Sequence, residues 1–233
     1  CSGYVYGLST AFSYATHKGL NRVLLLVGDT LSKTVSLKDK ATNLLFGDAG
    51  TATLIEKNPD YNESFFSLNS DGSGFSKLII PGGGFRTPSS KETIKEKKYE
   101  DGSIRTDEQL RMDGMDVFNF AMREIPSDIK KIAEYSKISL EKVDFIIFHQ
   151  ANKFMTDFFA KKLKYPKEKV PYSIQKFGNT SSASIPLTLV SELREILITQ
   201  NIRTILSGFG SGLSWGTASL ELGNCHVSHL IEL

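Results

Sequence analysis

Three side chains of this 233-residue sequence could together perform acyl-transfer chemistry: Cys1, His149 and Asn179. A cysteine thiolate is a nucleophile that can take up an acyl group as a thioester. A histidine and an asparagine can each donate a hydrogen bond to a carbonyl oxygen as that oxygen becomes anionic. The apolar run before His149 is typical of a buried strand, and a histidine at a strand end is usually structural, so the set needs support from its surroundings.

That support comes from the sequence words around the three residues. These words are Cys1-Ser2-Gly3-Tyr4, Leu45-Phe46-Gly47-Asp48-Ala49-Gly50-Thr51-Ala52, Met112-Asp113-Gly114-Met115-Asp116-Val117-Phe118, Phe148-His149-Gln150-Ala151-Asn152, Gly178-Asn179-Thr180-Ser181-Ser182-Ala183-Ser184-Ile185-Pro186 and Gly208-Phe209-Gly210-Ser211-Gly212-Leu213-Ser214-Trp215-Gly216. Together they resemble the β-ketoacyl-acyl-carrier-protein (ACP) synthase III family, the initiating condensing enzymes with a thiolase fold. Region 87–109 matches none of the family's words.

The resemblance implies a role for each candidate residue. Cys1 would attack an acyl-CoA thioester, and the main-chain N–H groups of Cys1 and Ser211 would hold the oxyanion, although the family often has glycine at the position of Ser211. His149 and Asn179 would donate to the enolate oxygen that forms when malonyl-ACP loses carbon dioxide. The product would be a β-ketoacyl-ACP, and neither a metal nor another cofactor is implied. Phe209 would line the acyl pocket.

Basic residues are the candidates for substrate docking. By resemblance, Lys161 and Lys162 would contact the acidic carrier protein and Lys40 would contact CoA. Two departures from the family bear on this prediction, because Phe154 and Lys40 both stand where the family commonly has arginine. A solvated helix face is the alternative explanation for the lysine pair.

The composition is that of an ordinary globular protein. It is 40% hydrophobic and 23% charged, and its formal net charge of +2 does not indicate a nucleic-acid or membrane-surface partner. The sequence contains no apolar run of the roughly 20 residues needed to span a bilayer and no signal peptide. Two cysteines favour a reducing compartment, so we expect a cytoplasmic protein.

Apolar periodicity predicts alternating helices and strands, which favours an α/β layered fold. Helical spacing of small residues after Cys1 would place the sulfur at the positive end of a helix dipole, which favours the thiolate. Strand 22–29 reads as buried on both faces, and Pro126 should kink or restart the long helix that contains it. The predicted helices are 3–18, 118–133, 154–163 and 181–199, and the predicted strands are 22–29, 51–56, 65–69, 144–148, 202–207 and 217–222.

The resemblance sharpens this pattern to a thiolase-like fold with layers α-β-α-β-α, whose first half is incomplete here. We expect residues 1–80 to be the rest of the first half, beginning at the nucleophile, and residues 81–233 to be the second half, with a variable loop at 87–109. The full-length protein would be a homodimer. Residues 1–233 alone would then be poorly soluble and inactive, since an exposed sheet edge invites aggregation.

Three other interpretations stay open from the residues alone. A papain-like protease also uses Cys, His and Asn in this order, but its Cys-Gly-Ser-Cys-Trp signature is missing. A hydrolase with an N-terminal nucleophile would use the α-amine of Cys1 as base, which explains nothing else in the sequence. The third alternative is a truncated, non-catalytic fragment or subunit that retains only the fold.

Overall fold

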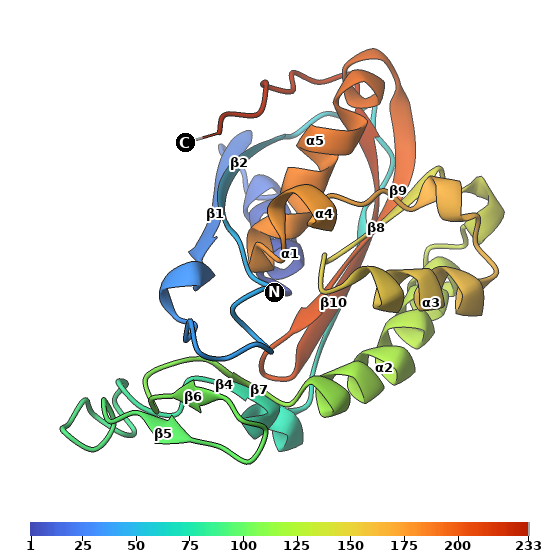
Figure 1. The fold of residues 1–233 in the computed structure, drawn as a ribbon. Helices are drawn as coiled ribbons and strands as arrows, with labels where there is room; N and C mark the ends of the chain where they lie inside the picture. The colour runs from blue at the N-terminus through green and yellow to red at the C-terminus, as the bar shows by residue number, and fades with distance from the viewer. Residues whose placement is uncertain (233) are drawn as a thin grey trace.

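The computed structural model describes residues 1–232 and contains two main sheets (Figure 1). The smaller sheet follows a single buried helix and consists of two antiparallel strands that pair along their whole length. The small residues along the helix allow it to pack closely, and the Leu25 side chain lies against Gly7. These elements are helix α1 (Gly3–Ala15) and strands β1 (Arg22–Thr30) and β2 (Asp48–Glu56).

The larger sheet repeats this arrangement of a helix followed by two antiparallel strands. Its strand order is β3-β10-β9-β8, with β3 antiparallel to β10 and β8 parallel to β9. The repeated helix is α5 (Ser184–Thr199), and the strands are β3 (Phe65–Ser70), β8 (Phe145–Phe148), β9 (Asn201–Gly210) and β10 (Ser214–Gly223). The division of the chain at residue 80 stays a prediction.

Two hydrophobic clusters hold the layers together. One joins the larger sheet to helices α2 (Gly114–Tyr135) and α3 (Lys153–Leu163) through buried aromatic residues, and the short helix α4 (Ile174–Phe177) follows α3. The other lies between the two sheets and is formed by the apolar faces of α1 and α5. The order of layers is therefore helices, sheet, helices, sheet (Figure 1).

The prediction that strand 22–29 is buried on both faces is wrong for the described residues. Leu24, Leu26 and Leu54 are each more than half exposed, whereas Leu25 and Ile55 face the second cluster. Side chains alternate between the faces of a strand, so one face of β1 and β2 packs on helices while the other is uncovered. A continuous apolar run cannot distinguish these two situations.

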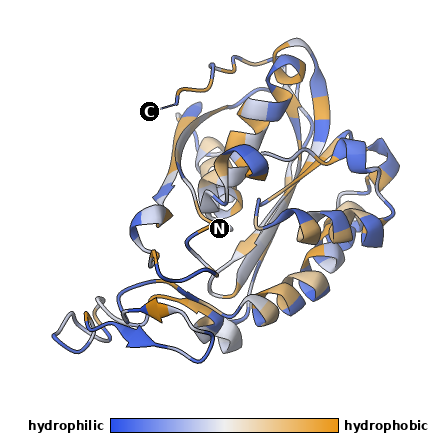
Figure 2. Cartoon of the chain, in the orientation of Figure 1, coloured by the Kyte–Doolittle hydropathy of each residue, from blue (hydrophilic) through white to orange (hydrophobic). Residues whose placement is uncertain are grey.

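Residues 81–109 form a mostly hydrophilic extension beside the end of α2 (Figure 2). The lysine-rich part is largely solvent-exposed, as predicted from its alternating charges. Its few regular elements are the pair β5 (Lys97–Lys98) and β6 (Ile104–Arg105), while β4 (Leu78–Ile79) and β7 (Arg111–Met112) pair at its base. None of the described helices is both long and apolar enough to cross a bilayer.

Helix α2 runs continuously through Pro126. The predicted alternative in which the helix restarts at this proline is therefore wrong. Proline has no N–H, so the carbonyl of Met122, one turn earlier, loses its usual helical donor. The ammonium group of Lys162 on α3 takes that place, with Nζ 2.9 Å from the Met122 oxygen. A tertiary hydrogen bond thus compensates for the interruption.

We predict that Lys162→Met lowers the free energy of unfolding by about 1 kcal/mol, because a buried helical carbonyl loses its donor. The same change in a Pro126→Ala background should cost less, since an alanine at that position supplies the missing N–H. A double-mutant cycle followed by urea denaturation measures this coupling. Lys161→Met, on the same helix, is the control. Equal costs of Lys162→Met in both backgrounds would contradict the compensation.

Candidate active site

Cys1 lies immediately before α1 and against strand β9. It is a free, partly exposed thiol, and its sulfur accepts a hydrogen bond from the Ser181 hydroxyl at 3.4 Å. A Cβ atom at Gly210 would lie only 3.1 Å from that sulfur and 2.9 Å from the Cys1 Cβ. Glycine is therefore required at 210 because the candidate nucleophile occupies the space of a side chain.

His149 follows β8 directly and is fixed by three contacts. Its main-chain N–H donates to the Ser207 carbonyl of β9 at 2.8 Å, which extends the pairing of the two strands by one residue. Its Nδ1 lies 2.7 Å from the Ser184 hydroxyl, and its ring meets Phe209 edge to face with 5.3 Å between centroids. Only 2% of His149 is exposed, so the imidazole is held in one orientation.

Burial determines the charge of this imidazole. Desolvation lowers the pKa of His149 well below its usual value, although a hydrogen bond with the Ser181 main chain opposes the shift. The Ser184 hydroxyl accepts the Gln150 N–H at 3.3 Å, so its own proton is available for Nδ1 of His149. With Ser184 as the donor to Nδ1, the neutral ring carries its proton on Nε2, which is the tautomer that a donor role of His149 requires.

Asn179 is held by both its side chain and its main chain. Its Oδ1 accepts the Ser181 N–H at 2.9 Å, which leaves the Nδ2 amide group as a donor. Its main-chain N–H donates to Leu45 at 2.8 Å, and its carbonyl accepts the N–H of Gly47 at 3.0 Å. The segment before β2 therefore clamps Asn179 on both sides.

Ser181 connects the three predicted catalytic residues. It bonds to the Cys1 sulfur through its hydroxyl and to Asn179 through its amide, and its main chain contacts the His149 ring. Its φ of 53° lies in the left-handed region, which is unusual for serine and marks a constrained position. The sequence patterns predicted no role for Ser181 or Ser184; the serine-rich word after Asn179 was the available signal.

The turn after β9 adjoins the nucleophile. Ser211 follows Gly210, and its hydroxyl donates to the Leu78 carbonyl at 3.0 Å. The Ser211 carbonyl accepts the Ser214 hydroxyl at 2.8 Å, so both sides of the residue are fixed. This places the Ser211 region beside Cys1, while its role in an oxyanion hole stays a prediction.

The remaining candidate residues divide into exposed and buried positions. Lys40 and Lys161 are exposed, and Lys162 is exposed but engaged with the Met122 carbonyl. Phe154 is 68% exposed and stacks on Phe118 of α2. Phe209 is almost fully buried between His149 and Phe159.

Comparison with known proteins identifies the family of this chain. Residues 1–73 match the family model described as 3-oxoacyl-[acyl-carrier-protein (ACP)] synthase III, and residues 133–222 match the C-terminal model of the same family. A putative 3-oxoacyl-[acyl-carrier-protein] synthase 3 of Campylobacter jejuni is 40% identical over 99% of this chain and 64% of its own length. A β-ketoacyl-[acyl-carrier-protein] synthase III of Streptococcus pneumoniae is 36% identical, covering 95% and 66%.

Solved structures give the same result. A 3-oxoacyl-(acyl-carrier protein) synthase from Burkholderia xenovorans superposes with a TM-score of 0.89 at 38% identity, covering all of this chain and 65% of that one. A 3-oxoacyl-(acyl-carrier-protein) synthase III reaches a TM-score of 0.90 at 36% identity, covering 94% and 66%. The chain thus spans just under two thirds of the length of these relatives. Its matches at both ends and its thiolase-like fold show that it belongs to the 3-oxoacyl-[acyl-carrier-protein] synthase III family.

Proposed function

We propose that the protein containing this chain condenses a short acyl-CoA with malonyl-ACP to give β-ketoacyl-ACP and carbon dioxide, the first condensation of fatty-acid synthesis. The observation that carries this proposal is the convergence of Cys1, Asn179 and His149 on Ser181. It brings a thiol together with two neutral hydrogen-bond donors. The names of the relatives supply the carrier-bound product class.

In the first half-reaction, the Cys1 thiolate attacks the thioester carbonyl of acyl-CoA. The tetrahedral intermediate collapses, the bond to the CoA sulfur breaks, and CoA leaves as a thiol after taking up a proton. Main-chain N–H groups of Cys1 and Ser211 are the proposed donors to the oxyanion. The Ser181 hydroxyl supports the thiolate, because hydrogen bonding to a charged form favours that form.

In the second half-reaction, malonyl-ACP loses carbon dioxide and its electron pair moves into an enolate. The Nε2–H of His149 and the Nδ2–H of Asn179 are proposed to hold the enolate oxygen. Two neutral donors suit this step, because they stabilise a developing negative charge without transferring a proton to the carbon that must react next. That carbon then attacks the acyl group on Cys1, and the thiolate is released with the β-ketoacyl-ACP.

The geometry favours condensation over proteolysis. A cysteine protease needs its histidine as a base that takes the thiol proton. Here burial lowers the pKa of His149, which makes the ring a poor base, and Nδ1 faces Ser184. The matched families and relatives are synthases and give the protease no support. A non-catalytic fragment is the outcome that the acylation experiment below would reveal.

Helix α3 is the proposed docking surface for the carrier protein. Its last turn carries Lys161 and Lys162, and the exposed Phe154 near its first turn stacks on Phe118. Because Phe154 stands where the family has arginine, we propose a contact with more apolar and less charged character there. Lys40 is the proposed contact for CoA. The proposed working form is a cytoplasmic homodimer without a resident cofactor.

We predict that the full-length protein, incubated with acyl-CoA, gains one acyl group on the peptide that contains Cys1. Mass spectrometry of the digested protein detects the added mass, and Cys1→Ser should abolish this thioester. Cys225→Ser, which removes the exposed second thiol, is the matched control and should leave acylation intact. An unmodified Cys1 in folded full-length protein would refute the proposed function.

His149→Ala and Asn179→Ala should separate the two half-reactions. We expect decarboxylation of malonyl-ACP and overall condensation to fall roughly 100- to 1,000-fold, because each change removes one donor to the enolate. Self-acylation from acyl-CoA should persist. Release of carbon dioxide and acylation of Cys1 are measured separately, with the exposed His226→Ala as control. If both variants lost acylation as completely as Cys1→Ser, this division of roles would be wrong.

The lowered pKa of His149 also predicts a pH dependence of stability. The unfolded chain binds a proton near the ordinary value of 6.5 while the folded state does not, so stability falls as pH decreases below 6.5 toward the folded pKa. The loss of stability should therefore be measurable between pH 7 and pH 5. His149→Gln should remove it in denaturation experiments at fixed protein concentration, whereas the exposed His17→Gln should not. Equal pH slopes for wild type and His149→Gln would contradict a neutral, buried imidazole.

A further inference from the structure

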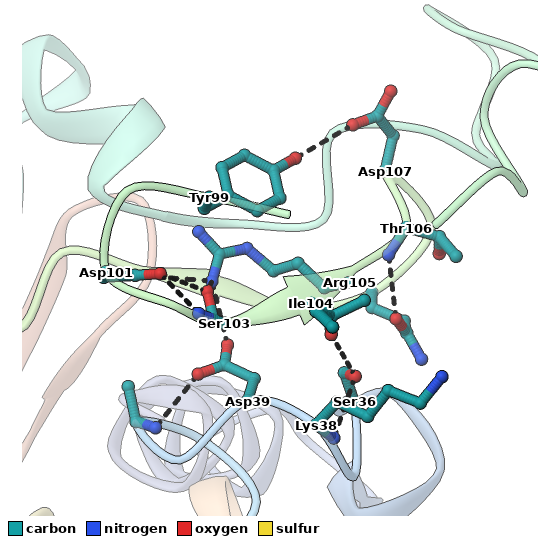
Figure 3. A network of polar contacts seen from close by, with 12 residues as sticks. Ser36, Lys38, Asp39, Tyr99, Asp101, Ser103, Ile104, Arg105, Thr106 and Asp107 are labelled. Atoms are coloured by element: carbon teal, nitrogen blue, oxygen red, sulfur yellow. Dashed lines mark hydrogen bonds and ion pairs between the residues drawn. The ribbon is translucent and has the colours of Figure 1, made fainter. Parts of the chain in front are cut away.

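The stretch of chain that clamps Asn179 is itself anchored at its other end. Residues 36–47, called here the Asp39 segment, connect η1 (Leu31–Lys33) and β2 through consecutive turns. One end bonds to the main chain of Asn179 through Leu45 and Gly47. The other end bonds to the extension at 81–109, the region that matches no family word (Figure 3).

A buried ion pair forms the anchor. The Arg105 side chain is 8% exposed and that of Asp39 only 1%, and Nη1 lies 3.1 Å from the carboxylate. The same nitrogen donates to the Ser103 hydroxyl at 2.5 Å, and the guanidinium lies 4.0 Å from the ring centre of Tyr99. Figure 3 shows that Tyr99, Ser103 and Arg105 all come from the extension, whereas Asp39 comes from the facing segment.

Hydrogen bonds to the main chain of Ile104 reinforce this anchor. The Ser36 hydroxyl donates to the Ile104 carbonyl at 2.6 Å (Figure 3). The Ile104 N–H donates to the Lys38 carbonyl at 3.2 Å. Ser36 is 4% exposed, so this contact is also buried. The extension therefore holds the segment at Ser36, Lys38 and Asp39.

Hydrogen bonds continue from the ion pair to Asn179. The other carboxylate oxygen of Asp39 accepts the Ala41 N–H at 2.9 Å, and the Asp39 carbonyl accepts the Asn43 N–H at 2.9 Å. The Leu45 N–H then donates to Thr42 at 3.1 Å, and the Leu45 carbonyl accepts the Asn179 N–H. Because each turn is hydrogen-bonded to the preceding one, the position of Asp39 determines the position of Leu45.

Close packing transmits this position to the active site. A Cβ atom at Gly47 would lie 2.0 Å from the carbonyl oxygen of Phe177, and one at Gly178 would lie 2.9 Å from that of Leu45. The two main chains are thus in direct contact. A shift of the Asp39 segment cannot be absorbed by side chains and must move residues 177–179 as well.

We propose that Arg105 is a positioning residue for the decarboxylation step: by holding Asp39, it keeps the Asn179 amide directed at the substrate oxygen. This proposal rests on the proposed function. Lys40, the proposed CoA contact, follows Asp39 in the sequence, so the same ion pair fixes the main chain from which the Lys40 side chain extends. The extension would thereby act on decarboxylation through Asn179, without itself contacting the reacting atoms.

Two ion pairs join the same two stretches of chain, and they differ in burial. Lys38 and Glu96 are 56% and 55% exposed with 2.7 Å between their charged atoms, so their pair contributes little. Removing Arg105 leaves the Asp39 carboxylate without its counterion inside the protein, whereas removing Asp39 leaves Arg105 with the more exposed Asp101 at 3.7 Å. The exposed pair is therefore a matched control for the buried one.

The test uses the full-length protein with the variants Arg105→Met, Arg105→Lys and Asp39→Asn, and with the controls Lys38→Met and Glu96→Gln. We expect Arg105→Met and Asp39→Asn to slow malonyl-ACP decarboxylation roughly 10- to 100-fold, the effect of a misplaced catalytic group. Acylation of Cys1 at saturating acyl-CoA should change less than about twofold, and Arg105→Lys should recover part of the loss. Both controls should stay within about twofold of wild type.

Hydrogen exchange supplies a readout that does not depend on activity. The amides of Leu45, Gly47 and Asn179 should exchange faster in Arg105→Met than in Lys38→Met, because only the former releases the segment. Where Arg105→Met fails to fold, the milder Ser36→Ala, which removes the hydroxyl contact with Ile104, should show the same selective effect in smaller degree.

Specific outcomes would overturn the proposal. Unchanged decarboxylation in a folded Arg105→Met protein would do so, as would an equal fall of decarboxylation and acylation, which indicates general damage. Unchanged exchange at Leu45 and Gly47 would also refute the coupling. If wild type itself fails to acylate Cys1, the proposed function fails, whereas the exchange comparison still judges whether Arg105 positions Asn179.

Discussion

The candidate site depends on one tight turn, the backbone around Ser181 in its left-handed conformation. In that conformation its amide reaches the Asn179 side chain while its hydroxyl reaches the Cys1 sulfur. Ser181 alone thus orients two reactive groups: its hydroxyl bonds to the Cys1 sulfur, and its main-chain N–H bonds to Oδ1 of Asn179. The orientation of the nucleophile and that of a proposed enolate donor are therefore not independent.

The repeated helix–strand–strand units explain why these groups meet. Cys1 precedes the helix of the first unit, and Asn179 lies just before the helix of the second. The Ser182 N–H donates to the Asp29 carboxylate of β1 at 3.1 Å, and a Cβ atom at Gly3 would lie 2.7 Å from the Ser182 hydroxyl. The starts of both helices are thus packed together, and the sheets that follow bury the remaining sides. Candidate catalytic residues from opposite ends of the sequence become neighbours because the two units share this junction.

Local patterns in the sequence predicted most of the elements. The family resemblance predicted the three central residues, and the fold brings them together around Ser181, while their catalytic roles stay predictions. Helix and strand periodicity located α1, α3, α5 and the strands of both sheets to within a few residues. Three features required tertiary information. The exposed face of β1 depends on what packs against it, and the continuity of α2 through Pro126 depends on Lys162 from another helix. The hydroxyls of Ser181 and Ser184 acquire their roles only when the chain brings them to Cys1 and His149.

Lys162 has a structural contact that bears on its proposed docking role. Its ammonium group caps the carbonyl that Pro126 leaves without a donor, so its charge is tied to α2 and is less free to meet a carrier protein. Lys161, one position earlier, is exposed, and Phe154 adds an apolar surface near the other end of α3. An acidic partner approaching this helix would therefore find fewer mobile charges than the lysine count suggests. An exposed ion pair contributes little affinity, whereas an aromatic side chain that becomes buried in an interface contributes more. In the proposed complex with the carrier protein, the stacked Phe154 and Phe118 would therefore supply a larger part of the binding energy than the lysines.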